Sequence, residues 1–519
     1  MTDRITAFPL RSERLLTIAI AVLVLMKLLL PFLLNGDWGF HRDEFLYLAM
    51  GDHLAWGYLE VPPVIAVLGA VADALFGSHV ALIRLFPALA GAATMVLIVA
   101  MTIRMGGGRY AQVLAVLGYL VAIVNLRINV LFQPVAFDML AWVAAVYGFM
   151  VAIRENRARD WILLGLVVGI GLLTKYTMLL FAGGAVLALL LTPHRRLLGT
   201  PWPWVAALIA VAVWSPNLYW QLREGWPVVE HMTVLAERQL QHVDPMIFLL
   251  VQILMNPWGA PLWLLGLWWC LTRPEGRPWR PLAWIYLANL AVLLLLSGKV
   301  YYLAPAYPML LAAGATALEG IFRARAARRI AMAVPLVMLA GSAPLVPLAL
   351  PLLPVEDTIA YGRFGTEHLG FGEALRWEDG TVRELPQDFA DMLGWEELVA
   401  ATADVFRSLP PGQQAHCGLY ADNYGQAGAF DRYGERYGLP PVISKGSSYW
   451  LWGYRGYDGD PLIIVGLEAA LIDNNFDRIV EVRRYRHPFA RETDLPILVV
   501  GEPTQSMAAL WAILKKYRY

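Results

Sequence analysis

The sequence predicts a polytopic α-helical membrane protein of about 11 spans with a C-terminal extracytoplasmic α/β domain. Three observations carry this prediction. Of the 519 residues, 58% are hydrophobic and only 16% are charged, whereas soluble domains carry about 25% charged residues. Long apolar runs alternate with arginine clusters, and from residue 355 onward charged residues, glycine and aspartate become frequent. We therefore expect a membrane domain at 1–354 and a soluble domain at 355–519.

The first apolar run, 15–34, is long enough to cross a bilayer, because about 20 helical residues span roughly 30 Å of hydrocarbon. It is long for a cleaved signal peptide and no small-residue cleavage site follows it, so we interpret it as a retained anchor. The runs at 161–174 and 177–192 are short, and the alternative is one re-entrant pair or one long tilted helix. The predicted spans are 15–34, 79–103, 110–130, 135–153, 161–174, 177–192, 202–220, 246–271, 281–297, 303–320 and 330–353.

The arginine clusters predict the orientation of the chain. Cations are dense at 4–14, 104–109, 154–159, 195–196, 273–280 and 323–329, and sparse in the short loops between those clusters. Because cytoplasmic loops carry the excess of Lys and Arg, the N-terminus is predicted to be cytoplasmic. The loop 35–78 and the C-terminal domain are then extracytoplasmic. In that domain the runs HCGLYA, PLIIVG and LPILVV indicate strands, and LGWEELVAATADVFRSL indicates an amphipathic helix.

Several classes of function lack their sequence signals. The formal net charge is zero, so the chain has no basic footprint for nucleic acid. There is no P-loop, Rossmann glycine motif, HExxH or GxSxG, and without a nucleotide site any activated donor would have to be carried by lipid. Cys270 and Cys417 lie on opposite sides of the membrane in the predicted topology, which excludes a disulfide between them and a cysteine metal site.

The loop after the first span is unusually acidic for a membrane edge. It contains Asp43 and Glu44, and a helix starting near Phe40 would place Asp43, Tyr47 and Met50 on one face. A carboxylate there can take a proton from a hydroxyl nucleophile or hold a divalent cation. The alternative is that the pair only solvates an interfacial helix.

Asp138 is a second carboxylate of interest. It lies about one turn inside the outer end of the fourth predicted span, where Pro134 suits the first turn of the helix. Ionisable residues inside a bilayer are costly and usually face a cavity or a partner. We expect a functional role; the alternative is an ion pair with a nearby arginine.

A set of cations is predicted near the outer leaflet, against the general charge trend. Such cations neutralise an anionic headgroup, and Tyr301 and Tyr302 would donate hydrogen bonds to a phosphate oxygen. Snorkelling explains one or two of the cations, and an aromatic belt is the alternative for the tyrosines. The cations are Lys27, Arg84, Arg127, Lys175 and Lys299.

The first loop resembles that of the family 39 glycosyltransferases of the GT-C fold, which include protein O-mannosyltransferases and the aminoarabinose and galacturonic acid transferases of lipopolysaccharide. The family pattern is D-E-x-x-Y followed by G-Y-x-x-x-P-P, and the resemblance continues at QPVAFDMLAW, LLTKYTMLLF and SGKVYYLAPAYP, over about residues 15–320. The matching loop positions are Asp43, Glu44, Tyr47, Gly57, Tyr58, Pro62 and Pro63.

The resemblance implies an enzyme that transfers a sugar from polyprenyl phosphate, with inversion, at the outer face of a bacterial inner membrane. The acceptor would be a hydroxyl of lipopolysaccharide, a protein or a cell-wall glycan. Some members use a divalent metal and others do not; Asp43 and Glu44 would be its ligands. The predicted site residues are the catalytic carboxylates Asp43, Glu44 and Asp138, the lipid-phosphate ligands Lys175, Lys299, Tyr302, Arg84 and Arg127, and the substrate-loop residues Tyr47 and Tyr58.

Two other functions fit parts of the sequence. A transporter or flippase of lipid-linked sugars would also need many spans and outer-leaflet cations, but transporters tend to carry midplane charges and internal repeats, and the sequence has neither. An assembly protein that binds its partner through 355–519 would leave the acidic loop unexplained.

Overall fold

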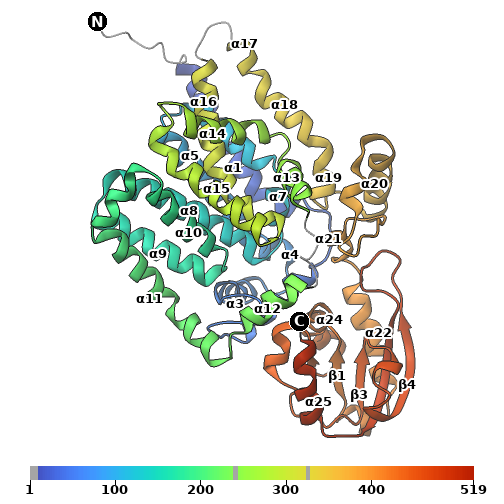
Figure 1. Ribbon diagram of the computed structural model, residues 1–519. Coiled ribbons are helices and arrows are strands. Elements are labelled where there is room, and N and C mark those ends of the chain that lie inside the picture. The colour runs from blue at the N-terminus through green and yellow to red at the C-terminus, as the bar shows by residue number, and fades with distance from the viewer. Residues whose placement is uncertain (1–9, 238–243, 323–327, 519) are drawn as a thin grey trace, which may run out of the picture. The chain divides into compact units, whose positions relative to one another are not determined.

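The computed structural model describes residues 10–237, 244–322 and 328–518 (Figure 1). The arginines predicted to be cytoplasmic at 4–9 and 323–327 lie outside these residues. The chain divides into two compact units. The helical unit contains the described residues up to 33, together with 84–224 and 235–350. The mixed unit contains 34–83, 225–234 and the described residues from 351 onward.

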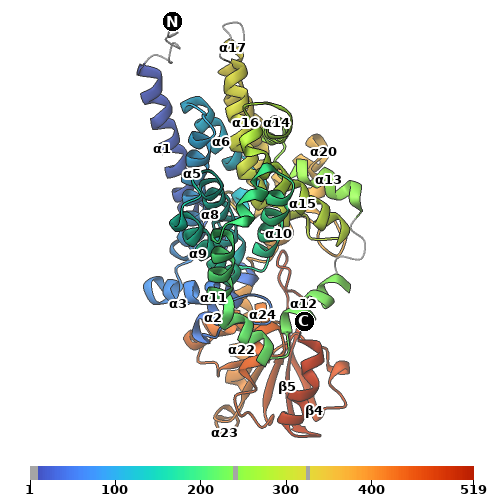
Figure 2. The same ribbon diagram turned by 60° about the vertical axis from the view of Figure 1, so that its left-hand side comes forward.

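The helical unit is built from apolar helices joined by short turns. The helix α8 packs against α5 and α9, α14 packs against α16, and Figure 2 shows α1 alongside α5. The elements are α1 (Leu10–Leu33), α5 (Leu85–Arg104), α6 (Arg109–Leu120), α7 (Ile123–Ile128), α8 (Pro134–Glu155), α9 (Ala158–Thr174), α10 (Met178–Leu190), η1 (Pro193–Gly199), α11 (Trp202–Arg223), α13 (Pro245–Leu254), α14 (Ala260–Thr272), η3 (Arg277–Trp279), α15 (Arg280–Leu295), η4 (Val300–Ala306), α16 (Tyr307–Phe322), α17 (Arg328–Ala331), α18 (Ala333–Ser342), η5 (Ala343–Leu345) and α19 (Val346–Ala349).

Within the described ranges, five helices are long and apolar enough to cross a membrane. A sixth is added if α10 and η1, which meet at a bend of 105°, form one broken span. The predicted total of eleven spans stays a prediction, because several of the other helices are shorter. The five are Glu13–Leu33, Val80–Arg104, Pro134–Glu155, Trp202–Arg223 and Arg277–Leu295.

Two of the predicted spans are wrong as single helices. The segment 110–130 breaks at Ala122, whose backbone is extended (φ −69°, ψ 122°), so that α6 and α7 are separate. The segment 246–271 breaks between α13 and α14, where the Asn256 side chain accepts the N–H of Gly259 (3.0 Å) and Pro257 has no N–H to offer a helix. A hydropathy profile does not reveal these two helix breaks, because the flanking residues are apolar.

The mixed unit contains the first loop, a short helical segment and the C-terminal part of the chain. Its elements are α2 (Arg42–Asp52), α3 (Val64–Phe76), α4 (Val80–Ile83), α12 (Pro227–Leu235), α20 (Val355–Leu369), η6 (Phe371–Leu375), α21 (Gln387–Ala390), α22 (Trp395–Ser408), α23 (Pro411–Gln414), β1 (Gly418–Ala421), α24 (Tyr424–Tyr433), η7 (Gly434–Tyr437), β2 (Val442–Ser444), η8 (Ser447–Trp452), β3 (Leu462–Val465), η9 (Ala469–Leu471), β4 (Phe476–Tyr485), β5 (Leu495–Pro503), α25 (Met507–Leu514) and η10 (Lys515–Tyr517).

A five-stranded mixed sheet forms the core of the C-terminal part, in the order β2-β1-β3-β5-β4. The strand β1 is parallel to β2 and β3, whereas β5 is antiparallel to β3 and β4. The helix α25, red in Figure 1, packs Leu510 and Trp511 onto a face that includes Leu462 and Ile464. The strands predicted from HCGLYA, PLIIVG and LPILVV and the helix over 393–409 are confirmed.

The first loop packs against the C-terminal part of the chain within this unit. The Phe45 ring on α2 lies 5.5 Å from that of Trp395 and 6.0 Å from that of Tyr433. A Cβ atom on Gly428 would lie 2.3 Å from the Cβ of Phe45, so only glycine allows α24 to approach α2 this closely. The loop 35–78, predicted as part of the membrane domain, is therefore in one compact unit with residues from 351 onward.

Candidate active site

Asp138 lies on α8, which begins at Pro134 as predicted. Its side chain is buried, and the Thr177 hydroxyl donates a hydrogen bond of 2.7 Å to Oδ2. The other carboxylate oxygen, Oδ1, is buried and has no hydrogen-bond partner within the described residues. A buried acceptor of this kind is costly unless it is used, which favours a functional role for Asp138.

Lys175 lies where the chain leaves α9 and turns toward α10. Its extended backbone (φ −159°, ψ 142°) ends α9 at Thr174 and separates the two short helices. Its Nζ lies 5.1 Å from the ring centroid of Tyr301 and 5.0 Å from that of Tyr302, both within cation–π range. Lys175 is attracted electrostatically by Asp138 and repelled by Lys299.

The segment η4, which contains the two tyrosines and has Lys299 as its N-cap, is held by a buried glutamine. Gln252 donates a hydrogen bond from Nε2 to the Val300 carbonyl (3.1 Å) and accepts one at Oε1 from the Tyr307 hydroxyl. Because Lys175 contacts both tyrosine rings and interacts electrostatically with Asp138 and Lys299, the structure brings Asp138, Lys175, Lys299 and Tyr302 together, with Tyr301 beside them. We call these five residues the lysine–tyrosine cluster.

The other predicted cations have different surroundings. Lys27 is buried in the helical unit and donates to the Asn125 carbonyl (2.8 Å), so it stabilises helix packing. Arg84 is buried at the start of α5, and Arg127 is half-buried in α7. Roles for Arg84 and Arg127 in lipid-phosphate binding stay predictions.

In the mixed unit, the acidic loop forms the start of α2. His41 is its N-cap: the His41 ring accepts the Asp43 N–H (3.1 Å) and Glu44 Oε2 accepts the His41 N–H (2.8 Å). This is a capping box, in which two otherwise unpaired backbone donors are satisfied. Glu44 is fully buried, so its carboxylate stabilises the helix start.

Asp43 is half-buried and lies beside Tyr424 of α24. The Tyr424 hydroxyl donates a hydrogen bond of 2.8 Å to Asp43 Oδ1, and the Arg42 guanidinium stacks 4.8 Å from the Tyr424 ring centroid. Burial and then the negative charge of Asp43 raise the pKa of Tyr424 well above its usual value. The tyrosine therefore stays a neutral donor that orients the carboxylate.

The two predicted loop tyrosines differ in exposure. Tyr47 is half-buried on the same helix as Asp43. Tyr58 is buried, and its hydroxyl donates to the carbonyls of Met50 and His53 and accepts the Ala55 N–H, at 3.0–3.1 Å. Tyr58 shapes the loop by closing this turn, whereas a role for Tyr47 at the substrate stays a prediction.

A role for Asp43 and Glu44 as metal ligands stays a prediction. Glu44 is used as the helix cap, and Asp43 is hydrogen-bonded to Tyr424. Among the residues that the structure describes, the side chains that converge with metal-ligand spacing are His41, Asp388 and Asp391.

Glu60 is a further shielded carboxylate in the loop. Ser448 Oγ donates to its Oε2 (2.6 Å) and accepts the Leu59 N–H (3.1 Å). Burial raises the pKa of Glu60, although the bonds from Ser448 and Ser447 oppose the shift. The folded protein therefore binds this proton more tightly than the unfolded chain.

The raised pKa predicts a pH effect for Glu60→Gln. The stability contributed by protonated Glu60 is complete below the unfolded pKa near 4.5 and is lost as the pH rises through the folded pKa. The glutamine of the mutant does not titrate, so the melting temperature of the mutant relative to the wild type should increase between about pH 4 and 8. Thermal unfolding of the detergent-solubilised chain measures this, with the exposed Glu435→Gln as the control. Parallel pH curves for Glu60→Gln and wild type would contradict it.

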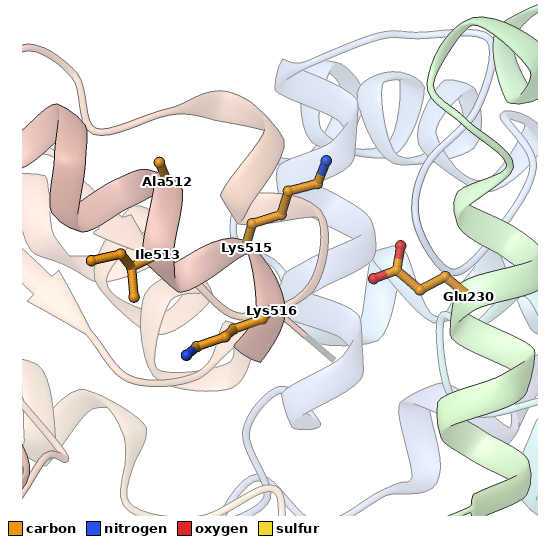
Figure 3. Close-up of a pocket in the computed structure, with 5 residues that line it drawn as sticks. All are labelled: Glu230, Ala512, Ile513, Lys515 and Lys516. Carbon is orange, nitrogen blue, oxygen red and sulfur yellow. The ribbon is translucent and has the colours of Figure 1, made fainter.

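A cavity of about 460 Å³ lies at the end of the C-terminal helix in the mixed unit. Its lining includes Lys515 and Lys516 from η10 and Glu230 from α12, and Figure 3 shows Lys515 extending toward the side where Glu230 lies. Arg518 pairs with Glu230. Three cationic side chains against one carboxylate make the surroundings of this cavity net positive.

Comparisons with known proteins find similarity in both sequence and fold. The family model described as dolichyl-phosphate-mannose-protein mannosyltransferase matches residues 60–220, a range that includes Asp138 and Lys175. The structure also superposes on that of ArnT from Cupriavidus metallidurans bound to undecaprenyl phosphate, with a TM-score of 0.59 over 95% of this chain and 98% of that one, at 16% identity. The chain has the GT-C fold. The apo structure of the same ArnT gives the same score over 93% and 97% of the two chains.

One relative is similar in sequence. Lipid A galacturonosyltransferase RgtD of Rhizobium johnstonii is 29% identical over 200 residues, which are 38% of this chain and 41% of RgtD. The resemblance to GT-C glycosyltransferases that the first loop indicated is thus confirmed, and so is the helical membrane fold with a C-terminal sheet domain.

Four residues that contact the site residues or the segments beside them were missed from the sequence. Thr177 is two residues from Lys175, in the same LLTKYTMLLF stretch, where a hydroxyl in an apolar run could have indicated a polar partner. Tyr424 lies in ADNYGQ, 381 positions from Asp43, so no local spacing links the two residues. Gln252 and Asp391 carried no local signal, because an isolated amide or carboxylate has no spacing that reports its partner.

Proposed function

We propose that this protein is a glycosyltransferase that moves a sugar from a polyprenyl-phosphate donor to a hydroxyl acceptor at the outer face of the bacterial inner membrane. The observation that carries the proposal is the lysine–tyrosine cluster, in which Lys175 and Lys299 gather beside a buried carboxylate. One of the ArnT structures that share the fold is bound to undecaprenyl phosphate. A lipid phosphate is anionic and accepts hydrogen bonds, so two lysine cations and two tyrosine hydroxyls would bind it.

The cations are proposed to stabilise the leaving group. A departing lipid phosphate is already a good leaving group, so it needs charge stabilisation more than a general acid. Lys175 and Lys299 supply that charge, and Tyr301 and Tyr302 donate hydrogen bonds to the phosphate oxygens. Asp138 positions Lys175 by attraction, while Thr177 orients Asp138. Fixed charges of this kind are worth about 10²–10³ in rate.

Asp43 is proposed to be the general base. Its carboxylate is half-buried and oriented by the Tyr424 hydroxyl, so it is held ready to take the proton from the acceptor hydroxyl. The proposed reaction is a direct displacement with inversion at the anomeric carbon, for which a single carboxylate base suffices. Glu44 is assigned to the helix cap that holds Asp43 in place.

The acceptor is proposed to be an anionic envelope lipid. RgtD is by name a lipid A galacturonosyltransferase, and the net positive cavity beside Lys515 and Lys516 suits a phosphorylated headgroup. The two lysines are exposed, so their contribution to binding is modest.

Neutralising both lysines should therefore weaken acceptor binding. The double mutant Lys515→Gln/Lys516→Gln is expected to raise KM for a phosphorylated acceptor about fivefold and leave kcat unchanged, because exposed ion pairs are worth up to about 1 kcal/mol. Initial rates against acceptor concentration measure this, with the exposed Arg436→Gln as the matched control. An unchanged KM would place the acceptor elsewhere.

The proposed activity is tested with purified protein in liposomes that contain a polyprenyl-phosphate sugar and lipid A. Mass spectrometry should detect a lipid A product heavier by one sugar, and NMR of the new linkage should report the inverted anomer. Movement of the lipid-linked sugar across the bilayer without any product would instead identify a flippase. Comparing envelope glycolipids and glycoproteins with and without the protein would identify the natural acceptor.

A further inference from the structure

Three side chains from distant parts of the sequence converge at the start of α2. The ligand atoms of His41, Asp388 and Asp391 all lie within 4.8 Å of one another. His41 Nε2 is 3.7 Å from Asp388 Oδ1 and 3.7 Å from Asp391 Oδ2. His41 and Asp391 are buried, while Asp388 is 41% exposed and opens the group to solvent.

A hydrogen bond to Nδ1 determines which nitrogen of the His41 imidazole faces the two carboxylates as a possible ligand. His41 Nδ1 accepts the Asp43 N–H (3.1 Å), so its lone pair is occupied and Nε2 must carry either a proton or a metal. Nε2 is buried and has no hydrogen-bond partner in the part of the chain that is described. At 3.7 Å both carboxylates are too distant for a hydrogen bond, yet both face this nitrogen.

The spacing and the charge fit a bound cation. Zinc binds nitrogen and oxygen at about 2.0–2.2 Å, which in tetrahedral geometry places two ligand atoms roughly 3.3–3.6 Å apart. The two separations of 3.7 Å from His41 Nε2 are close to that spacing. Asp43, Asp388 and Asp391 act electrostatically on the imidazole. Two arginines lie beside Asp391: Arg491 Nη1 is 3.1 Å from Oδ2, and Arg42 Nη1 is 3.9 Å from Oδ1.

An arginine beside a ligating carboxylate is compatible with a metal site, because ligating carboxylates are usually hydrogen-bonded to a further group that orients them. Arg491 has that position here. One imidazole and two carboxylates leave a tetrahedral metal with a fourth position for water. Among common divalent ions, imidazole favours zinc over magnesium or calcium.

We propose that His41, Asp388 and Asp391 bind one divalent transition-metal ion, preferably Zn²⁺. The ion would join the N-cap of α2 to α21 (Gln387–Ala390) and its neighbour Asp391. Because the same imidazole accepts the Asp43 N–H, the ion would also fix the backbone from which the Asp43 side chain extends. His41 is in this sense a positioning residue.

The experiment uses full-length, tag-free protein that has been stripped with EDTA and desalted. Titration calorimetry with Zn²⁺ should give one site per chain, and Zn²⁺ should raise the melting temperature. Co²⁺ should bind in its place and give a visible spectrum with imidazole ligation. In His41→Asn and Asp388→Asn, Zn²⁺ affinity should fall about 100-fold or more and the Co²⁺ spectrum should be lost.

The variants separate loss of a ligand from loss of folding. Asparagine is a good N-cap, so His41→Asn keeps the acceptor for the Asp43 N–H and removes only Nε2. Asp388 is partly exposed, so its amide should fold normally. The matched control is Glu384→Gln, an exposed carboxylate that pairs with Arg363, and it should bind Zn²⁺ like the wild type. No stoichiometric Zn²⁺ binding in the wild type, or equal binding in His41→Asn and wild type, would overturn the proposal in favour of a neutral imidazole whose Nε2–H faces two carboxylates. Neither result depends on sugar transfer, so the proposed function is tested separately.

Discussion

Replacing Asp43 with asparagine is expected to lower the rate of sugar transfer by about 10²–10⁴-fold, the range that a positioned base contributes. Asparagine keeps the size of the side chain and still accepts a hydrogen bond from Tyr424, so the helix start should be unchanged. What is lost is the ability to take a proton from the acceptor. The measurement is single-turnover transfer in liposomes, with donor and acceptor at saturation.

Two companion variants define the interpretation. Asp37→Asn alters an exposed carboxylate of the same loop and should transfer sugar at the wild-type rate. Tyr424→Phe removes the hydrogen bond that orients Asp43 and should have an intermediate rate, because the base is retained but less fixed. If Asp43→Asn inserts and melts like the wild type and retains full activity, Asp43 is not the base.

Replacing Lys175 with glutamine should lower kcat/KM by about 10²–10³-fold, the usual effect of removing one preorganised charge from a developing anion. Glutamine preserves a polar side chain of similar reach but leaves Asp138 without its attracting cation. Affinity for undecaprenyl phosphate should fall as well, because ground state and transition state both carry the phosphate charge. The same direction is expected for Lys299→Gln.

Arg195→Gln is a suitable control for Lys175→Gln. Arg195 is an exposed cation of the arginine-rich set and lies outside the lysine–tyrosine cluster, so its loss should change neither rate nor affinity. Lys175→Arg should recover part of the activity, since arginine keeps the charge but presents it with a different shape. Wild-type kinetics in both Lys175→Gln and Lys299→Gln would show that the phosphate binds elsewhere.

A large part of the fold could be predicted from the sequence, because the signals that predict it are local. Pro134 predicted the start of α8, and the apolar runs predicted where helices lie, although 110–130 and 246–271 each contain a break. Short apolar runs predicted three of the five strands. The resemblance in the first loop indicated the GT-C fold that the comparisons confirm. Each of these properties depends on residues within about one helix or strand of one another, where spacing and composition report burial directly.

The tertiary structure alone decided which distant residues meet. Gln252 reaches η4, Tyr424 reaches Asp43 across 381 positions, and Asp388 and Asp391 approach His41. The close packing of α2 on α24, which Gly428 permits, joins the first loop to the C-terminal part of the chain. The physical reason is that a polar side chain selects its partner by packing and desolvation in the folded state, and a single sequence does not record either when the partners are hundreds of residues apart.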